Sequence, residues 1–479
     1  MDHNGFNLAA SARQEMIEHG FSPDFPPEVE RQLATIRVEP DRSLRDLTSL
    51  DWSSIDNDDS RDLDQIEWAE RTAAGIRVLV AVADVDSAVP KATPIDAHAQ
   101  RETTTVYAGI RNFPMLPERL STDLTSLSEN QDRAAIVIEL LVGADGSCSN
   151  TSIYRARVRN RAQLTYNAVG AWLEGTAAPP PKVAASPDLQ AQLKLQDEAA
   201  QSLQEARHRL GALTFDRVEA QAVVSDGHVE GIQSRRSNRA AKLIEDFMIA
   251  ANEVMAQTLR AAGVSSIRRV VKAPERWPRI VELARQYGDT LPPEPDSGAL
   301  NAFLMRRKQA DPVHYEDLSL SVLKLMGPGE YVLMRRGDDE QGHFGLAAHD
   351  YTHSTAPNRR FADLVTQRLL KSLAAPPPYA DEELDSIARN CTLKEDAARK
   401  VQRNMNKRLA AVALGSRVGQ AFQGVVTGVT PKGVFVRVFD PPVEGRVMRG
   451  ESGLDVGDRV RVTLLSTDPQ RGFIDFGRS

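Results

Sequence analysis

The chain has 479 residues, of which 41% are hydrophobic and 26% charged, with a formal net charge of −7 at pH 7. This length suits two or three domains with one large core. No apolar run approaches the roughly 20 residues that cross a bilayer, and the start lacks a signal peptide, so we expect a cytoplasmic protein with no membrane contact. The two cysteines, Cys148 and Cys391, exclude a disulfide framework and a zinc finger.

Residues 1 to about 45 predict two short helices. Ser11 to Gln14 resembles a capping box, which would begin the first helix at Ser11. Pro26 and Pro27, followed by Glu28, are typical of a second helix start. This region is either a small element that touches a nucleic acid or an arm that packs on the next domain, and we favour packing.

The densest feature of the chain is an acidic run with five aspartates in nine positions, from Asp56 to Asp64, ahead of an apolar strand predicted over 75–85. Carboxylates this close repel one another, so the run favours a hard divalent cation. The alternative is a solvated acidic loop. A calcium loop of the EF-hand type is disfavoured, because Arg61 stands where that loop needs glycine and a strand follows in place of a helix.

The middle of the chain is divided by proline-rich breaks. An insert at 176–187 precedes a long helix predicted at about 188–210, and prolines 376–378 separate the helix carrying Asp363 and Arg368 from a last pair of helices. Although the net charge is negative, basic residues gather at 399–408. That stretch is either a phosphate-binding surface or a solvated helix face.

From about Arg417 the pattern changes to short strands and glycine turns. We predict five strands, at 424–426, 433–438, 444–447, 456–462 and 472–476. Five strands over about sixty residues match an OB-fold barrel. Phe422 and Phe435 are candidates for aromatic rings that stack on bases, with burial in the barrel core as the alternative for each.

Five segments, in the same order, resemble the motifs of the ribonuclease II and ribonuclease R family of RNB-type 3′-to-5′ exoribonucleases. The segments are 55–64, 106–121, 162–166, 243–252 and 342–364. The resemblance spans about residues 45 to 410. It implies an α+β fold with a large mixed catalytic domain at 46–410 and an OB-fold RNA-binding domain at 417–479. The short helical region at 1–45 lies before the resemblance, and a winged-helix or helix-turn-helix element is one alternative for it beside the packing arm. Because about 45 residues are too few for another barrel, we expect the chain to lack N-terminal cold-shock domains.

The resemblance also implies the activity and its residues. It predicts a processive exoribonuclease, active in RNA turnover, that hydrolyses single-stranded RNA, including a 3′ overhang beside a duplex, to nucleoside 5′-monophosphates. The implied cofactor is Mg²⁺, with Mn²⁺ as the alternative, and we expect a monomer. The implied catalytic residues are Asp62, Asp64 and Arg359; the metal residues are Asp56, Asp62, Asp64 and Gln65; and the RNA-binding residues are Tyr107, Phe215, Glu245, Arg360, Glu395, Phe422 and Phe435.

Some positions depart from the family pattern. Gln65 stands where the pattern has a second aspartate, so the metal site loses a negative charge. The alternative to an active enzyme is therefore a catalytically impaired RNA-binding protein of the same fold. His349 and His353 have the spacing of a zinc-protease pair, but the general-base glutamate is absent, and we expect His353 to form a hydrogen bond within the arginine motif.

Overall fold

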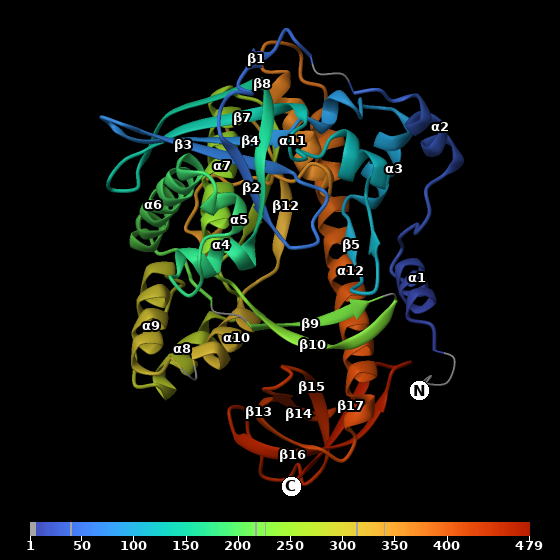
Figure 1. The fold of residues 1–479 in the computed structure, drawn as a ribbon. Coiled ribbons are helices and arrows are strands. Elements are labelled where there is room, and N and C mark those ends of the chain that lie inside the picture. The colour runs from blue at the N-terminus through green and yellow to red at the C-terminus, as the bar shows by residue number, and fades with distance from the viewer. Residues whose placement is uncertain (1–5, 39–40, 216–217, 226, 313–314, 340) are drawn as a thin grey trace.

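The computed structural model describes residues 6–38, 41–215, 218–225, 227–312, 315–339 and 341–479. Its centre is a six-stranded mixed sheet in the order β1-β8-β2-β3-β4-β7 (Figure 1). The strands are β1 (Arg45–Asp46), β2 (Trp52–Asp56), β3 (Gln65–Thr72), β4 (Gly75–Ala83), β7 (Asp132–Val142) and β8 (Cys148–Thr165).

The predicted apolar strand is β4, which is almost entirely buried between β3 and β7. A run of Val, Leu and Ala suits this place, because a strand covered on both faces needs no polar alternation. β2 lies between β3 and β8 and ends at Asp56. The acidic run therefore starts at a strand end near the middle of the sheet.

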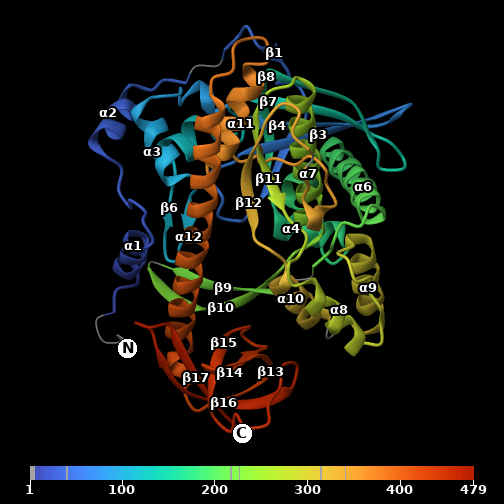
Figure 2. The same ribbon diagram turned by 180° about the vertical axis from the view of Figure 1, so that it is seen from behind.

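Helices surround this sheet (Figures 1 and 2). α7 (Arg239–Ala261) contacts the sheet and also packs on α4 (Tyr166–Leu173) and α6 (Pro187–Arg209), while α11 (Phe361–Lys371) packs on α7 and α12. The expected last pair of helices was wrong. One helix of 34 residues, α12 (Asp381–Leu414), takes its place, because the segment contains no glycine or proline to break it.

The N-terminal region forms the two expected helices, α1 (Leu8–Glu18) and α2 (Pro27–Thr35). The expected start of the first helix was wrong. α1 begins at Leu8, three residues before Ser11, because Asn7 caps it by accepting a hydrogen bond from the Ala10 N–H. α1 packs on α12, where Arg408 donates to Glu15 at 2.6 Å. This contact supports the packing interpretation, and it uses part of the basic 399–408 stretch.

The other elements form small layers around this body. They are α3 (Pro94–Glu102), β5 (Val106–Tyr107), β6 (Asn112–Phe113), α5 (Pro181–Ala184), β9 (Val218–Ser225), β10 (His228–Arg236), β11 (Ser266–Val271), α8 (Trp277–Gln286), α9 (Ser297–Ala310), α10 (Tyr315–Leu325) and β12 (Gly329–Met334). None of the helices in this described part of the chain combines the length and apolar character that a membrane crossing needs.

The C-terminal strands form a closed barrel in the order β13-β14-β15-β17-β16, next to the end of α12 (Figure 2). They are β13 (Ala421–Thr430), β14 (Gly433–Val438), β15 (Glu444–Arg449), β16 (Arg459–Asp468) and β17 (Phe473–Arg478). The predicted α+β class with a five-stranded barrel is confirmed.

The prediction that Phe422 stacks on bases is wrong for this structure. The side chain is only 6% exposed and packs edge-to-face on Phe476 inside the barrel. The alternation of β13 turns it inward, because the barrel needs large apolar side chains to fill its interior. Phe435 is half-buried on β14.

Candidate active site

The acidic run forms a compact, partly buried loop between β2 and β3. The Asp56 side chain accepts a hydrogen bond from the Asn57 N–H at 2.8 Å. Burial raises the pKa of Asp56, and burial together with the charge of Asp56 raises the pKa of Asp62. Asp58 and Asp59 are exposed. The structure therefore separates the run into inward carboxylates that repel one another and outward ones that are solvated.

Asp64 joins this loop to the arginine motif, almost three hundred residues away in sequence. Its side chain accepts hydrogen bonds from the Asn358 N–H at 3.1 Å and from Nε of Arg359 at 3.2 Å. Asp64 is 2% exposed, and burial raises its pKa to about 7 despite the opposing charge of Arg359. Of the three residues that the resemblance implied as catalytic, the structure thus brings Asp64 and Arg359 into direct contact, and the charge of Arg359 also acts on Asp62.

Arg360 points to a different partner. Its guanidinium makes a bidentate contact with Asp363, at 2.9 and 2.7 Å, and Asp363 also accepts from the Ala356 N–H at 2.8 Å. A guanidinium held in this way fixes the loop that carries Arg359. His353 shares one hydrogen bond with the Tyr331 hydroxyl at 2.8 Å. Because Tyr331 lies on β12, the expected hydrogen bond within the arginine motif is corrected to one that joins the motif to this strand.

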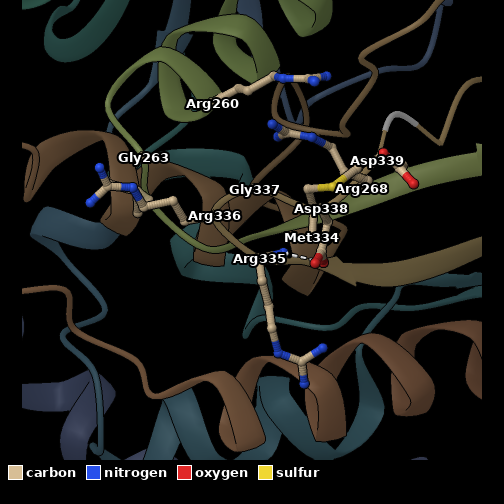
Figure 3. A pocket seen from close by; sticks show the side chains of 10 residues that line it. Arg260, Gly263, Arg268, Met334, Arg335, Arg336, Gly337, Asp338 and Asp339 are labelled. Atoms are coloured by element: carbon tan, nitrogen blue, oxygen red, sulfur yellow. Dashed lines mark hydrogen bonds between the residues drawn. The ribbon is translucent and has the colours of Figure 1, made fainter.

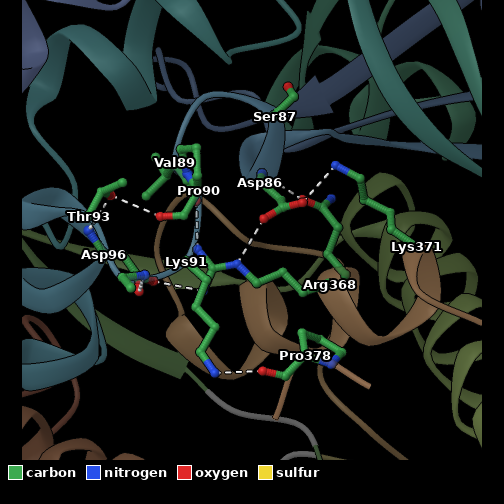
Figure 4. A network of polar contacts seen from close by, with 12 residues as sticks. Asp86, Ser87, Val89, Pro90, Lys91, Thr93, Asp96, Arg368, Lys371 and Pro378 are labelled. Carbon is green, nitrogen blue, oxygen red and sulfur yellow. Dashed lines mark hydrogen bonds and ion pairs between the residues drawn. The ribbon is translucent and has the colours of Figure 1, made fainter. Parts of the chain in front are cut away.

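A polar network fixes α11, which follows the arginine motif (Figure 4). The buried Arg368 donates to Asp86 at 2.8 Å, to Asp96 at 2.7 Å, and to the Val89 carbonyl oxygen at 2.6 Å. These partners lie in the segment after β4, so the network joins α11 to the central sheet. It therefore sets where the arginine motif meets the acidic loop.

Tyr107 lies on β5 at the edge of the same site. The residue is 39% exposed, while its hydroxyl is within electrostatic reach of Arg359 and of the inward aspartates. Burial, strengthened by the charges of Asp62, Asp64 and Asp56, raises the pKa of Tyr107 to about 12. A partly exposed aromatic ring beside the acidic loop is a suitable surface for stacking on a base.

Phe215 and Glu245 lie together at a different place, where both line a cavity of about 550 Å³. The cavity is also bordered by Arg207, Lys242 and His343, so its lining is mixed, with charged side chains beside apolar ones and the aromatic ring of Phe215. The inward aspartates are not among its lining residues. The structure therefore separates the expected RNA-binding residues into Tyr107 at the aspartates and a Phe215–Glu245 pair in this cavity.

Glu395 is held by arginines. Arg269 makes a bidentate contact with its carboxylate, with distances of 2.5 and 2.9 Å, and Arg399 also donates to it. No contact places Glu395 among the acidic-loop residues within the described part of the chain. This pairing accounts for another of the basic residues of the 399–408 stretch.

Another cavity, of about 490 Å³, lies by the turn after β12 and is lined by Arg260, Arg268, Arg335 and Arg336 (Figure 3). Its arginines point in different directions in the close view, and Arg335 pairs with Asp381 at 3.4 Å. This cavity shares no residue with the acidic loop. It does not provide converging charges for a phosphate group.

The inward carboxylates suit a divalent metal by their chemistry, because hard cations such as Mg²⁺ bind carboxylate oxygens. Among the described residues, however, no group of three or more acidic, histidine or cysteine side chains is already arranged around one metal position. Gln65, at the start of β3, is 8% exposed. The carboxylates are therefore of the right chemical type for a metal. In this structure, however, the Asp64 carboxylate contacts Arg359 and the Asn358 N–H, and the Asp56 carboxylate contacts the Asn57 N–H.

The sequence patterns did not indicate two residues that the structure singles out, Asn358 at the site and Glu67 on the adjoining strand β3. Asn358 contributes its N–H to Asp64, and its side chain accepts from Thr125 at 2.6 Å. Glu67 on β3 is fully buried, and both of its carboxylate oxygens lack a hydrogen-bond partner. The signal for Glu67 was an acidic residue two positions after Gln65, on the same face of a buried strand.

The fold is of the α+β class, with a mixed sheet and a separate closed barrel. Aspartates at one end of the sheet lie beside Arg359, and this pairing defines the candidate active site. The RNB domain model matches residues 44–375, and the model of the RNase II-type exonuclease C-terminal S1 domain matches residues 420–479. The chain belongs to the RNB family, as the motifs indicated.

Individual relatives agree with this assignment. The chain is 30% identical to Ribonuclease R of Escherichia coli over 94% of its own length, and 29% identical to Ribonuclease R 1 of Lactococcus lactis over 95%. It spans about 60% of the length of these curated relatives. Its fold is similar to that of Mycoplasma genitalium RNase R in complex with ribose-methylated single-stranded RNA, with a TM-score of 0.89 and 23% identity, covering 99% of this chain and 79% of the other. Nucleases of the RNB family depend in general on a divalent metal.

Proposed function

We propose that this chain is a 3′-to-5′ exoribonuclease that hydrolyses single-stranded RNA and releases nucleoside 5′-monophosphates. The observation that carries the proposal is the convergence of Arg359 and Asn358 on the buried carboxylate of Asp64, which lies almost three hundred residues earlier in the sequence. Membership in the RNB family supports the same reaction. The proposed metal is Mg²⁺, with Mn²⁺ as the alternative, and we propose a monomer.

The proposed chemistry divides between the metal and the chain. Asp56, Asp62 and Asp64 would hold the metal, which when bound supplies charge neutralisation and an activated water. The Arg359 side chain is 41% exposed, so it can clamp the scissile phosphate while its Nε donates to Asp64. Water adds to phosphorus, the bond to the 3′-oxygen breaks, and that oxygen takes a proton. Each cycle leaves a new 3′-hydroxyl end and one 5′-monophosphate.

RNA contacts are spread along a longer path. We propose that Tyr107 stacks on a base next to the acidic loop and that Phe215 stacks on another in its own cavity, because every base offers a π-face whatever the sequence. Glu245 in that cavity would bind a ribose 2′-hydroxyl, which distinguishes RNA from DNA. Arg360 and Glu395 would act indirectly, by holding the arginine motif and α12 in place.

A specific observation also supports the second candidate, an RNA-binding protein with impaired catalysis. Gln65 carries no charge where the family pattern has an aspartate, and no metal position is preformed among the described residues. Such a protein would retain the stacking and phosphate contacts and lose the hydrolytic step. The exoribonuclease and the impaired RNA-binding protein are therefore expected to bind RNA with similar affinity, and only the exoribonuclease is expected to degrade it.

The deciding experiment uses RNA labelled at its 5′ end, incubated with the chain and Mg²⁺. An exoribonuclease collapses the label to a short 5′ fragment and releases monophosphates, and chelation with EDTA stops the reaction. Retarded but unchanged RNA, with and without EDTA, would reject the enzyme and favour the binding protein. A chain that neither retards nor degrades the RNA would contradict both candidates.

A further inference from the structure

The strand β10 connects the barrel with the acidic loop. In both ribbon views the hairpin of β9 and β10 crosses between the central sheet and the barrel (Figures 1 and 2). Ile232 of β10 packs against the barrel core, and Arg235 near the end of the strand donates to the side-chain oxygen of Asn57 in the acidic loop. The next residue, Arg236, ends the strand. A single strand thus reaches from the barrel to the candidate active site.

Arg236 lies where two cavities meet. It lines the cavity of about 550 Å³ that holds Phe215 and Glu245, called here the inner cavity. It also lines a cavity of about 470 Å³ that holds Phe439, called here the barrel cavity. Glu316, in the first turn of α10, lines both cavities as well. The two cavities therefore adjoin each other at the pair of Arg236 and Glu316.

Both cavities offer the groups that bind a single RNA strand. In the barrel cavity, Arg459 lies over the exposed ring of Phe439, at 5.8 Å from the ring centre. The inner cavity has the Phe215 ring and the ammonium group of Lys242 in its lining. Aromatic rings beside cations suit a single strand, because bases stack on the rings while phosphates contact the cations. A strand that occupies both cavities has to pass Arg236.

The Arg236 guanidinium pairs with an acid and is still largely open to solvent. It donates to Glu316, yet 70% of the Arg236 side chain is exposed. A guanidinium has five N–H groups, and one carboxylate cannot use all of them. Exposed ion pairs are weak, and a phosphate accepts from a guanidinium in the same bidentate geometry as a carboxylate. An RNA phosphate can therefore take the place of the Glu316 carboxylate.

We propose that Arg236 binds an RNA phosphate at the junction of the two cavities and that Glu316 competes with the RNA for this guanidinium. The proposal rests on the proposed function, because it concerns the RNA path of the same site. Arg236 thereby raises the affinity for RNA, and Glu316 lowers it. The competing interpretation is a structural ion pair that only holds β10 on α10.

The test measures the affinity of the full chain for a fluorescently labelled oligouridylate of about 20 nucleotides, which exceeds the roughly 4–16 that one OB fold covers. EDTA is present so that no RNA is cleaved. The variants are Arg236→Gln, Glu316→Gln and the two combined. The controls are Arg279→Gln and Glu282→Gln, because these two residues form an exposed ion pair on α8 and line neither cavity.

We expect Arg236→Gln to weaken RNA binding by about tenfold, the usual worth of a hydrogen bond to a charged group. The dependence of log affinity on log salt should become less steep by about 0.7, because one phosphate contact is lost. Glu316→Gln should strengthen binding by about two- to fivefold, the worth of an exposed ion pair that the RNA no longer has to break.

The combined variant separates competition from a general effect of charge. In the Arg236→Gln background, Glu316→Gln should leave the affinity unchanged, because no guanidinium remains for which it competes. A general effect of charge would instead be additive. Each control substitution should change the affinity by less than about twofold at 0.15 M salt, where exposed charges more than about 8 Å apart are largely screened.

A structural ion pair predicts the same direction of change from either side, so weakened or unchanged binding in Glu316→Gln would overturn the inference. Unchanged binding in Arg236→Gln, or a gain from Glu316→Gln that persists in the combined variant, would also overturn it. RNA degradation by the unmodified chain with Mg²⁺ separates the two proposals. A chain that degrades RNA while these variants bind it normally keeps the proposed function and loses this inference, whereas a chain that neither binds nor degrades RNA loses both.

Discussion

The acidic site and the C-terminal barrel differ in the exposure of their key side chains and in how far apart in the sequence these side chains lie. At the acidic site, Asp64 is 2% exposed and is held by groups from residues 358 and 359. On the barrel, Phe439 and Phe473 are 44% and 54% exposed, and all five strands come from about sixty consecutive residues. Buried, long-range geometry suits one chemical step, whereas an exposed local surface suits many interchangeable contacts.

This difference predicts that single substitutions act unequally in the two regions. A change at the acidic site should remove turnover and leave RNA affinity, because affinity is spread over stacking and phosphate contacts. A change on the barrel surface should weaken affinity and leave the chemical step. The following substitutions test that separation.

The largest expected effect is on turnover. Asp64→Asn should abolish RNA degradation, since it removes the charge that faces Arg359, while RNA affinity stays within about threefold. The measurements are single-turnover rates and filter binding, with Asp59→Asn as the control because Asp59 is exposed in the same loop. A variant that kept more than about a tenth of the rate, a loss below about 1.4 kcal/mol, would remove Asp64 from the chemistry.

The next effect is on stability. Arg368→Met should lower the free energy of unfolding by about 3–5 kcal/mol, because it leaves the buried Asp96 without its cation. Urea unfolding measures this change, and Arg389→Met, an exposed arginine of α12, should change it by less than about 0.5 kcal/mol. An equally small change in both variants would show that the network around Arg368 does not fix α11.

The smallest effect is expected on the barrel. Phe439 lines a cavity between β10, α10 and the barrel, next to Arg459 and Arg236. Phe439→Ala should weaken RNA binding by about 1–3 kcal/mol, the usual worth of one stacked base, and leave the rate at saturating RNA unchanged. The control is Phe422→Ala, which should instead destabilise the barrel, because Phe422 is a core residue. Normal affinity in Phe439→Ala would place the RNA path elsewhere.

The sequence was most informative where local chemistry decides the structure. Alternation and glycine turns located the barrel strands, and the run of β-branched residues located β4. The motifs located Asp64 and Arg359, but their direct contact required the tertiary fold. The prediction that Phe422 stacks on bases was wrong, because alternation alone does not reveal which face of a strand points into a barrel. The prediction of two last helices was also wrong, because it assumed a break within a segment that contains no glycine or proline.

The site residues beyond the motifs also depended on the fold. Arg360 and Glu395 read as RNA-binding residues from the resemblance, and only the structure shows that Asp363 and Arg269 hold them. The burial of Glu67 and its two carboxylate oxygens without a hydrogen-bond partner are also visible only in the structure. Pairing and burial are three-dimensional properties, so a linear pattern names candidates without assigning their partners.

We propose that the acidic site hydrolyses RNA from its 3′ end. The most direct measurement is mass spectrometry of the nucleotides released in water enriched in ¹⁸O, for the unmodified chain and for Asp64→Asn. Hydrolysis predicts nucleoside 5′-monophosphates that carry one ¹⁸O in the phosphate from the unmodified chain, and no release from the variant. Nucleotides without ¹⁸O, release that persists in Asp64→Asn, or no release from either protein would contradict the account.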